Sequence, residues 1–147
     1  MVTKWMFGKK LIKSIEDCPS DSEGFVYKIT SLLDDRYYLG SKKLYNNKTV
    51  KLSKKKQEEL YSGRGRKKTK EKKKTVSDFM TYKSSSNELQ ELILLNGEVN
   101  FKFEIIKFFN NYTDMILFES YLIIKDFLDK NKNIINKWIT LKIRKND

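Results

Sequence analysis

Two tyrosines on neighbouring strand-like segments are the first residues whose chemistry could matter. Tyr27 follows Gly24-Phe25-Val26, and Tyr38 precedes Leu39-Gly40 after a short turn. A phenol close to cations and to a metal-assisted water can accept or pass on the proton released in phosphodiester hydrolysis. Tyrosines are also common in strands for packing reasons alone. Without further signals, the pair therefore favours a structural role.

The amino-acid composition excludes several kinds of catalysis. The chain of 147 residues contains no histidine and a single cysteine, Cys18. Ser-His-Asp triads, Cys-His dyads and zinc sites built from histidine or four cysteines are therefore impossible. A lone thiol cannot form an intramolecular disulfide, which favours a reducing compartment, and without a histidine base we expect Cys18 to be a bystander. Any catalysis would use carboxylates, tyrosines, cationic side chains and a hard metal ion.

One continuous segment accounts for the whole net positive charge of the chain. The formal net charge is +12, and the segment from Lys42 to Lys74 holds 15 Lys or Arg residues and three acids, which leaves the remainder neutral. Clustered charge of this kind is typical of proteins that bind a polyanion, most often nucleic acid. A solvated basic linker is the alternative. An anionic membrane is less favoured, because the segment lacks the interleaved apolar residues of an amphipathic face.

The residues that could take part in catalysis must be positioned by a small number of helices and strands. Residues 24–30 and 36–40 are rich in β-branched and aromatic side chains, which predicts a hairpin that turns at Asp34-Asp35. Serine and asparagine at 84–87 offer N-caps for a helix that Asn96-Gly97 would end. Alternation of apolar and charged residues from Phe101 to Ile105 predicts a third strand.

A second helix and a closing segment complete the expected domain. Thr113 or Asp114 can cap a helix over roughly 114–129, and Ile134, Ile135, Trp138 and Ile139 are expected to close the core. The order strand, strand, insert, helix, strand, helix predicts an α+β domain, in which a small central antiparallel sheet is flanked by helices.

The expected organisation is one domain with a long basic insert after its second strand. Residues 1–23 are predicted to be a polar lead-in, residues 24–147 the domain, and residues at about 42–76 the insert. Within the insert, residues 53–60 could be helical. We expect the rest to be mobile without a ligand, because like charges repel and little apolar surface offsets the entropy of ordering.

Several segments together resemble a known family. Gly24-Phe25-Val26-Tyr27 and Tyr38-Leu39-Gly40 resemble the two halves of the signature of the GIY-YIG nuclease superfamily, especially its phage-type endonuclease branch. The resemblance continues in the same order through 77–89, 96–106, 118–123 and 136–139. It spans about residues 24–139 and implies a small antiparallel sheet flanked by helices.

The resemblance also implies an activity and a set of site residues. It implies an endonuclease that hydrolyses DNA phosphodiester bonds with Mg²⁺ (or Mn²⁺), in a homing-type or host-DNA-directed role. It places Tyr27 as a proton acceptor or relay, Tyr38 as the residue that orients water or phosphate, and Glu119 as the metal ligand. A single carboxylate suits Mg²⁺, which keeps several waters and takes substrate phosphate oxygens. Without the resemblance, Glu119 would be interpreted as an exposed acid on a helix.

The chain departs from the family pattern at its cationic residues. Leucine replaces the isoleucine of the second half, a histidine found in some members is missing, and no arginine occurs between Gly40 and Arg64. Lys42 and Lys43, next to the motif, are therefore expected at the catalytic site, although lysine cannot bind phosphate with a planar two-pronged donor. Lys48, and Arg64 or Arg66 folding back, stay open as alternatives for the cation that neutralises the phosphate. The DNA backbone is expected to contact the basic residues of the insert, namely Lys48, Lys54, Lys55, Lys56, Arg64, Arg66, Lys67, Lys68, Lys72, Lys73 and Lys74.

Two other functions stay open at this point. One is a catalytically inactive nucleic-acid-binding protein on the same scaffold, and the other is a phage-encoded interaction or inhibitor protein with an acidic target. The chain lacks a stretch of about 18 apolar residues and the apolar block of a signal peptide. We therefore expect a cytoplasmic protein, in the host cytoplasm if phage-encoded, with no membrane partner and no small-molecule cofactor.

Overall fold

The computed structural model describes residues 3–139, which form two compact units. The first unit, here called the core, consists of the described residues up to Leu44 together with those from Asp78 onward. The second, here called the basic unit, is Tyr45–Ser77. Residues 140–147 of the domain expected over 24–147 lie outside the described part. No helix within residues 3–139 is long and apolar enough to cross a membrane.

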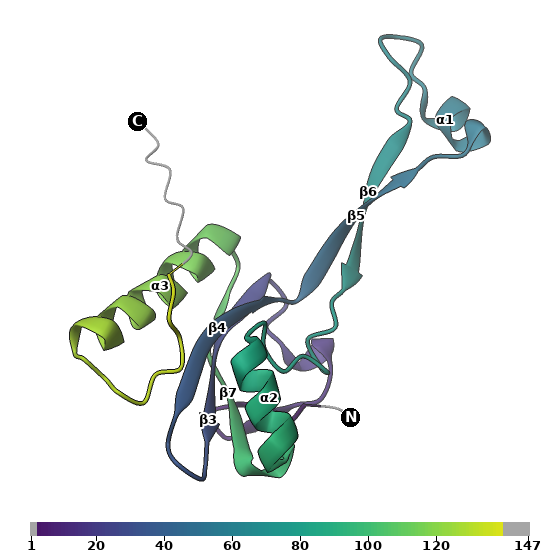
Figure 1. Ribbon diagram of the computed structural model, residues 1–147. Coiled ribbons are helices and arrows are strands. Elements are labelled where there is room, and N and C mark those ends of the chain that lie inside the picture. The colour runs from purple at the N-terminus through teal and green to yellow at the C-terminus, as the bar shows by residue number, and fades with distance from the viewer. Residues whose placement is uncertain (1–2, 140–147) are drawn as a thin grey trace. The chain divides into compact units, whose positions relative to one another are not determined.

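A five-stranded sheet forms the centre of the core (Figure 1). Its spatial order is β2-β1-β7-β3-β4, with the bounds β1 Trp5–Phe7, β2 Lys10–Ile12, β3 Gly24–Ser31, β4 Tyr37–Lys43 and β7 Phe101–Phe109. β3 pairs antiparallel with both β4 and β7, as expected for the hairpin and the third strand. The α+β class is therefore confirmed. The sheet is mixed, however, and not wholly antiparallel, because β1 runs parallel to β7.

The N-terminal residues contribute to this sheet. β1 and β2 come from the stretch that the sequence predicts to be a polar lead-in. The indole of Trp5 is fully buried, donates from Nε1 to the carbonyl of Phe79 at 2.8 Å, and packs against the rings of Phe25 and Tyr27. Burial of so large an aromatic side chain explains why this short segment belongs to the core.

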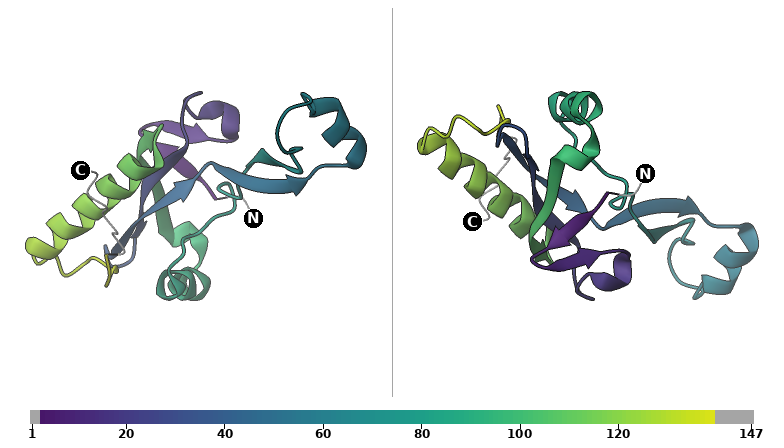
Figure 2. Two further views of the ribbon diagram at one scale, coloured as in Figure 1. Left: turned by 90° about the horizontal axis from the view of Figure 1, so that it is seen from above. Right: turned by 90° about the horizontal axis from the view of Figure 1, so that it is seen from below.

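Two helices lie on opposite sides of the strands (Figure 2). α2 (Asn87–Asn96) begins at Ser86, whose hydroxyl accepts from the Leu89 amide, and ends at Gly97, whose φ of 86° suits glycine. α3 (Tyr112–Leu128) is capped by Asn111 in place of the expected Thr113 or Asp114. Two short 3₁₀ helices, η1 (Ile15–Asp17) and η2 (Glu98–Asn100), complete the core.

Alternation along β4 sends its side chains to the two faces of the sheet. Tyr37 and Leu39 pack with Ile123 of α3. Gly40 lies on the other face, because its α-carbon faces the phenol of Tyr27 across the β3–β4 pair. β4 is an edge strand of the sheet, so residues that follow α3 can reach its free side.

The segment after α3 pairs with this free edge. The Tyr37 amide donates to the carbonyl of Asn133 at 2.9 Å, and the Ile135 amide donates to the carbonyl of Tyr37 at 2.7 Å. Ile135 is buried as expected. The expectation that Trp138 belongs to the core is wrong, since this side chain is 79% exposed and follows the last residue that is paired to the strand.

The basic unit is a hairpin with a helix at its connection. β5 (Tyr45–Lys51) pairs antiparallel with β6 (Lys70–Val76), and α1 (Lys54–Leu60) follows β5. The helix expected near 53–60 is confirmed, with Ser53 as its N-cap. The hairpin differs from the expected mobile insert. Its strands pair over their full length, so backbone hydrogen bonding organises residues that lack an apolar core of their own.

Candidate functional site

Glu119 lies near the middle of α3, and its side chain points to the edge strand β4. Its Oε2 accepts a hydrogen bond from the Ser41 hydroxyl of β4 at 2.6 Å. The side chain is half-buried. Burial raises the pKa of this carboxyl above its ordinary value, and the hydrogen bond from Ser41 opposes that effect. Among residues 3–139, no lysine or arginine forms an ion pair with it.

Tyr38 of β4 shares a cleft with Glu119. The cleft has a volume of about 320 Å³ and lies where β4, the N-terminal end of α2, α3 and the segment after α3 meet. Burial raises the pKa of the Tyr38 phenol, hydrogen bonding by Ser85 opposes the shift, and the nearby Glu119 charge adds to it. The phenol is therefore a neutral hydrogen-bonding group beside the carboxylate. Other lining residues include Ser85, Glu88, Asn136, Lys137 and Trp138.

Tyr27 lies behind this cleft and is completely buried. Its ring centroid is 6.3 Å from that of Tyr38, and its ring covers the backbone of Gly40, where any Cβ would overlap the phenol. The hydroxyl donates to Ser84 Oγ at 3.4 Å. Burial raises the pKa of Tyr27 well above its ordinary value, so this phenol is protonated at neutral pH.

Ser84, whose hydroxyl accepts the hydrogen bond from Tyr27, has an unusual backbone conformation. Its φ is 105°, which non-glycine residues rarely adopt, and its side chain is only 2% exposed. The Ser86 amide donates to Ser84 Oγ at 3.1 Å, and the Gln90 side chain donates to the Ser84 carbonyl at 2.5 Å. Backbone strain of this kind is held by the surrounding hydrogen bonds and is common at functional sites.

Asn136 ties the segment after α3 to the second half of the tyrosine motif. Its Oδ1 accepts from the Leu39 amide at 2.9 Å, and its Nδ2 donates to the Leu39 carbonyl at 2.7 Å. The side chain is 9% exposed, so both bonds are shielded from water. Asn136 thus replaces a neighbouring strand at Leu39, between the site residues Tyr38 and Ser41.

The lysines next to the motif have partners outside the cleft. Lys42 Nζ lies 2.6 Å from Asp78 Oδ1 and 4.1 Å from the ring centroid of Tyr82, and this pairing lowers the pKa of Asp78. Lys43 Nζ lies 4.2 Å from the ring centroid of Tyr112 on α3. Neither lysine lines the cleft. Among residues 3–139, the lysine that lines the cleft is Lys137, which also pairs with Glu88 at 3.4 Å.

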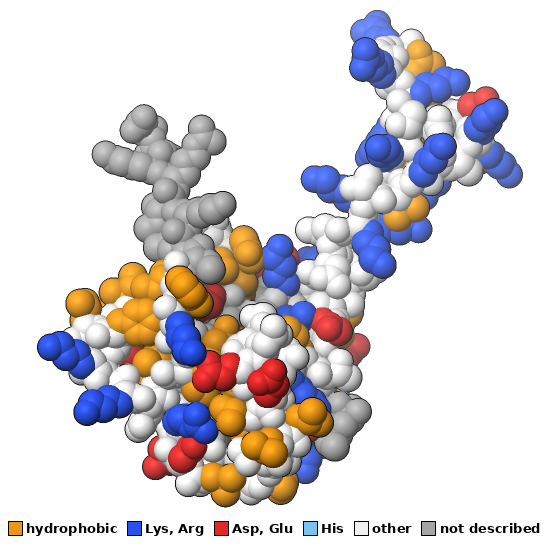
Figure 3. Space-filling view, in the orientation of Figure 1, with side chains coloured by type: hydrophobic (Ala, Val, Ile, Leu, Met, Phe, Trp, Pro, Cys, Tyr) orange, Lys and Arg blue, Asp and Glu red, His pale blue; other side chains and the backbone are white. Residues whose placement is uncertain are grey.

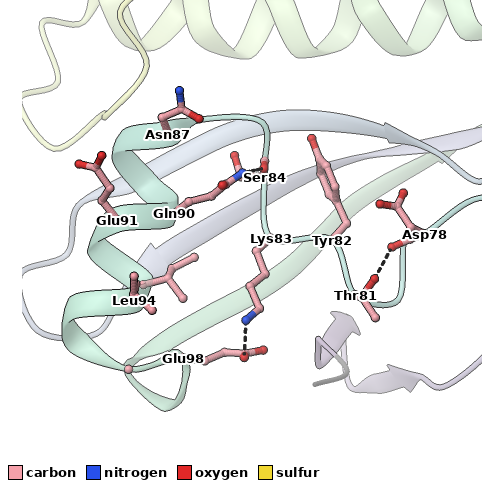
Figure 4. Close-up of a pocket in the computed structure, with 12 residues that line it drawn as sticks. Asp78, Thr81, Tyr82, Lys83, Ser84, Asn87, Gln90, Glu91, Leu94 and Glu98 are labelled. Carbon is pink, nitrogen blue, oxygen red and sulfur yellow. Dashed lines mark hydrogen bonds and ion pairs between the residues drawn. The ribbon is translucent and has the colours of Figure 1, made fainter.

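A second and larger hollow lies beside α2 (Figure 4). Two of its charged side chains, Lys83 and Glu98, pair with each other. Lys83 extends to Glu98, with an Nζ–Oε2 distance of 3.2 Å, and the Thr81 hydroxyl donates to the Asp78 carbonyl at 3.1 Å. Tyr82 on its wall packs edge-on against Tyr27 at 5.9 Å. Tyr82 therefore supports the buried tyrosine from the side of this hollow.

The remaining predicted site residues lie in the basic unit (Figure 3). Lys48, Lys72, Lys73 and Lys74 belong to the two strands, Lys54, Lys55 and Lys56 to α1, and Arg64, Arg66, Lys67 and Lys68 to the connection before β6. All are exposed. Lys56 pairs with Glu71 at 3.0 Å, and Lys74 and Lys67 lie over the rings of Tyr45 and Tyr61.

Of the predicted site residues, Tyr38 and Glu119 line the cleft and Tyr27 packs behind it, whereas the residues that position them were not predicted. Tyr27, Tyr38 and Glu119 come together around β4, whereas Lys42 and Lys43 point elsewhere. The roles of Ser41, Ser84 and Asn136 in positioning the site were not predicted from the sequence. Ser41 could have been found from strand alternation, since it shares a face with Leu39 and hence with α3.

Cys18 takes no part in this site. The thiol is 7% exposed and donates to the Ser14 carbonyl at a sulfur–oxygen distance of 3.9 Å. Burial raises the pKa of Cys18 to about 11, which disfavours the nucleophilic thiolate. The expectation of a bystander agrees with this environment.

A small mixed sheet with helices on both sides, two tyrosines around one strand and a glutamate on the last helix define a GIY-YIG-type domain. A family model described as "Putative endonuclease segE, GIY-YIG domain" matches residues 5–143. The chain belongs to this family. The match starts at the first residue of β1, earlier than the resemblance seen in the sequence. No curated protein and no solved structure matched the chain. The family consists of endonuclease domains, so the protein is of the nuclease class and its substrate class is nucleic acid.

Proposed function

We propose that the protein is an endonuclease that hydrolyses DNA phosphodiester bonds with Mg²⁺ (or Mn²⁺), and that Glu119 is the metal ligand. The observation that carries this proposal is the half-buried Glu119 carboxylate, which lines a cleft beside Tyr38 without an ion-pair partner among the described residues. Burying a carboxylate without a cation is unfavourable, and a bound metal ion would offset that cost.

The groups around Glu119 suit a hard cation. The described residues contain no cluster of three His, Cys, Asp or Glu side chains, so a site of several protein ligands is not formed there. The cleft offers oxygen donors, namely the carboxylate and the hydroxyls of Ser85 and Ser120. Mg²⁺ prefers oxygen, keeps several waters and often uses a single carboxylate together with phosphate. When bound, the cation would supply positive charge to the scissile phosphate.

The protein residues around the cleft have distinct proposed roles. Ser41 orients the Glu119 carboxylate through its 2.6 Å hydrogen bond. Tyr38 lines the cleft and can donate its phenol proton to a phosphate oxygen or orient the attacking water. Tyr27 is buried and neutral, so it serves as a relay towards Ser84 and as the residue that packs against Gly40, not as a phenolate base. Lys137 is placed to neutralise phosphate charge.

The decisive experiment compares two carboxylates that line the same cleft. Glu119→Gln should abolish nicking of supercoiled plasmid in Mg²⁺ or Mn²⁺, because the amide removes the ligand charge and keeps the shape. Glu88→Gln is the matched control, since Glu88 pairs with Lys137 and is 47% exposed. Its nicking rate should stay near that of the unmodified protein. Equal nicking by both variants would disprove the role of Glu119. No nicking by any protein, with DNA binding retained, would favour the binding-only alternative.

Metal binding can be tested without catalysis. Mg²⁺ added to the unmodified protein should raise the thermal unfolding midpoint, because a ligand that binds only the folded state stabilises it. Glu119→Gln should show no rise at the same Mg²⁺ concentrations, while Glu88→Gln should respond like the unmodified protein. A midpoint that rises equally in the Glu119→Gln variant would place the ion elsewhere.

A further inference from the structure

The β5–β6 hairpin has two chemically different faces. Residues paired directly across an antiparallel ladder lie on the same side, so the register divides the hairpin. The first side, here called the lysine face, is formed by Tyr45, Asn47, Thr49, Lys51, Lys70, Lys72, Lys74 and Val76. The second side, here called the helix face, is formed by Asn46, Lys48, Val50, Glu71, Lys73 and Thr75.

α1 associates with the helix face. Lys56 of α1 lies 3.0 Å from Glu71, and Gln57 donates to the carbonyl of Leu52 at 2.9 Å, just beyond β5. Val50 and Glu71, which face each other across the ladder, are half-buried, whereas Thr49 and Lys51 on either side are exposed. The contacts within the basic unit thus cover part of the helix face.

The lysine face carries four lysines and no acid. Lys51 and Lys70 are directly opposite each other, an arrangement of like charges that destabilises a hairpin on its own. Lys72 and Lys74 extend the same row along β6. A polyanion laid along this face would relieve the repulsion, and release of its counterions would favour binding.

We propose that the lysine face binds double-stranded DNA as a two-stranded ribbon in the major groove. A two-stranded β-ribbon fits that groove. The four lysines would contact phosphates, which position a protein without reading sequence. Asn47 and Thr49 are short, exposed and polar, lie on the same face, and would contact base edges, where asparagine pairs with adenine. The proposal deepens the proposed function, on which it rests for DNA as the substrate.

Matched lysine pairs test which face binds. Lys51→Ala with Lys70→Ala and Lys48→Ala with Lys73→Ala each remove two positive charges from directly opposed positions of the same hairpin. Binding of the full chain to a short duplex is measured in EDTA by fluorescence anisotropy over a series of salt concentrations. The slope of log K against log salt should fall in magnitude by about 1.8 for the lysine-face pair, and by less than about 0.5 for the helix-face pair. Equal falls, or tighter binding to a single strand than to the duplex, would overturn the proposal.

Base contact is tested with the Asn47→Ala variant and a selection from random duplexes. The unmodified protein should enrich a sequence preference, and the variant should lose it at one or two base pairs while the salt slope stays unchanged. An unmodified protein that enriches no preference, or a variant that enriches the same one, would contradict a role of Asn47 in base contact. Both assays are run in EDTA and do not depend on cleavage, so an absence of nicking leaves these measurements intact.

Discussion

Gly40 and Tyr27 show how tightly the residues of the motif are matched in size. The Tyr27 phenol lies against the Gly40 backbone, where a methyl group would overlap it. Gly40 is therefore required for space and not for backbone freedom. The same packing makes Tyr27 of β3 inaccessible and keeps its hydroxyl on Ser84, while Tyr38, on β4 next to Gly40, remains at the cleft. Two tyrosines of one motif thus have different chemical environments.

The environment of Glu119 predicts a pH-dependent effect on stability. Burial raises its pKa in the folded protein above the ordinary value of 4.5, so the native state is penalised wherever the carboxyl is ionised. Below pH 4.5 both states are protonated and the penalty is absent. As the pH rises through the folded pKa, the free energy of unfolding of the unmodified protein should fall relative to that of Glu119→Gln.

Denaturant titrations in EDTA at a series of pH values measure this difference. The Glu119→Gln variant should be the more stable protein at neutral pH, and its advantage should shrink towards pH 4.5. Glu88→Gln, at an exposed position of the same cleft, controls for the general effect of removing a negative charge. Parallel pH curves for the two variants would mean that the Glu119 environment does not penalise the charge.

The sequence brought the residues of the candidate site together better than it predicted their surroundings. Tyr27, Tyr38 and Glu119 are separated by up to 92 positions and were joined only by a family resemblance, since no local pattern links a strand to a distant helix. Ser84 could not be predicted, because its role depends on a positive φ and on a buried contact with β3. The ion pair of Lys42 with Asp78 could not be predicted, because Asp78 becomes a neighbour only in the folded chain.

At the scale of elements, the unpaired edge of β4 depends on the segment after α3. Ile135 and Asn133 pair with Tyr37, and Asn136 then satisfies both backbone groups of Leu39. This segment contains no regular strand, so one side chain substitutes for the next residue of a ladder. The arrangement leaves the Ser41 side of β4 free for Glu119.

Removing the Asn136 side chain should destabilise the core. Asn136→Ala would leave a buried amide and a buried carbonyl of Leu39 without partners, at a cost of about 2–4 kcal/mol in the free energy of unfolding. Asn133→Ala is the control, because that side chain is exposed and its contribution to the strand edge is made by the backbone carbonyl. Urea denaturation followed by tryptophan fluorescence measures both. Equal stability of the two variants would show that water replaces the Asn136 amide.

Helices and central strands were predictable from periodicity, while the outer elements were not. The apolar repeat of α2 and the alternation in β7 identify those elements directly. β1 and β2 contain only three residues each, too few for a periodic signal, and β6 is dominated by lysine, which sequence patterns do not associate with strands. β1 pairs with β7, β2 with β1 and β6 with β5, and this pairing determines their conformation.

The molecule as a whole divides charge and packing between its two units. Almost all large buried apolar residues belong to the core, with Leu52 as an exception in the basic unit. The basic unit, in contrast, holds most of the segment that carries the net charge. Folding of the core and attraction of a polyanion are therefore assigned to different parts of the chain.

This division predicts that the basic unit can be removed without unfolding the core. Tyr45 and Val76 are directly paired at the base of the hairpin, so the chain enters and leaves the unit at neighbouring points. A short glycine-serine linker that replaces Tyr45–Ser77 should join Leu44 to Asp78 without strain. The shortened protein should keep a cooperative unfolding transition and the Mg²⁺-dependent rise of its midpoint. Its affinity for duplex DNA should fall by at least about tenfold at low salt, because the main source of phosphate contacts is gone.

Calorimetry and anisotropy together separate the possible results of this deletion. An intact transition with weakened DNA binding supports the division into a folded core and a binding unit. A shortened protein that still binds duplex with the full salt dependence would move the DNA contacts to the core, where Lys42, Lys43 and Lys137 are the nearest candidates. A protein without a cooperative transition would mean that the core needs Leu52 and its neighbours, so that the charged insert also contributes to folding.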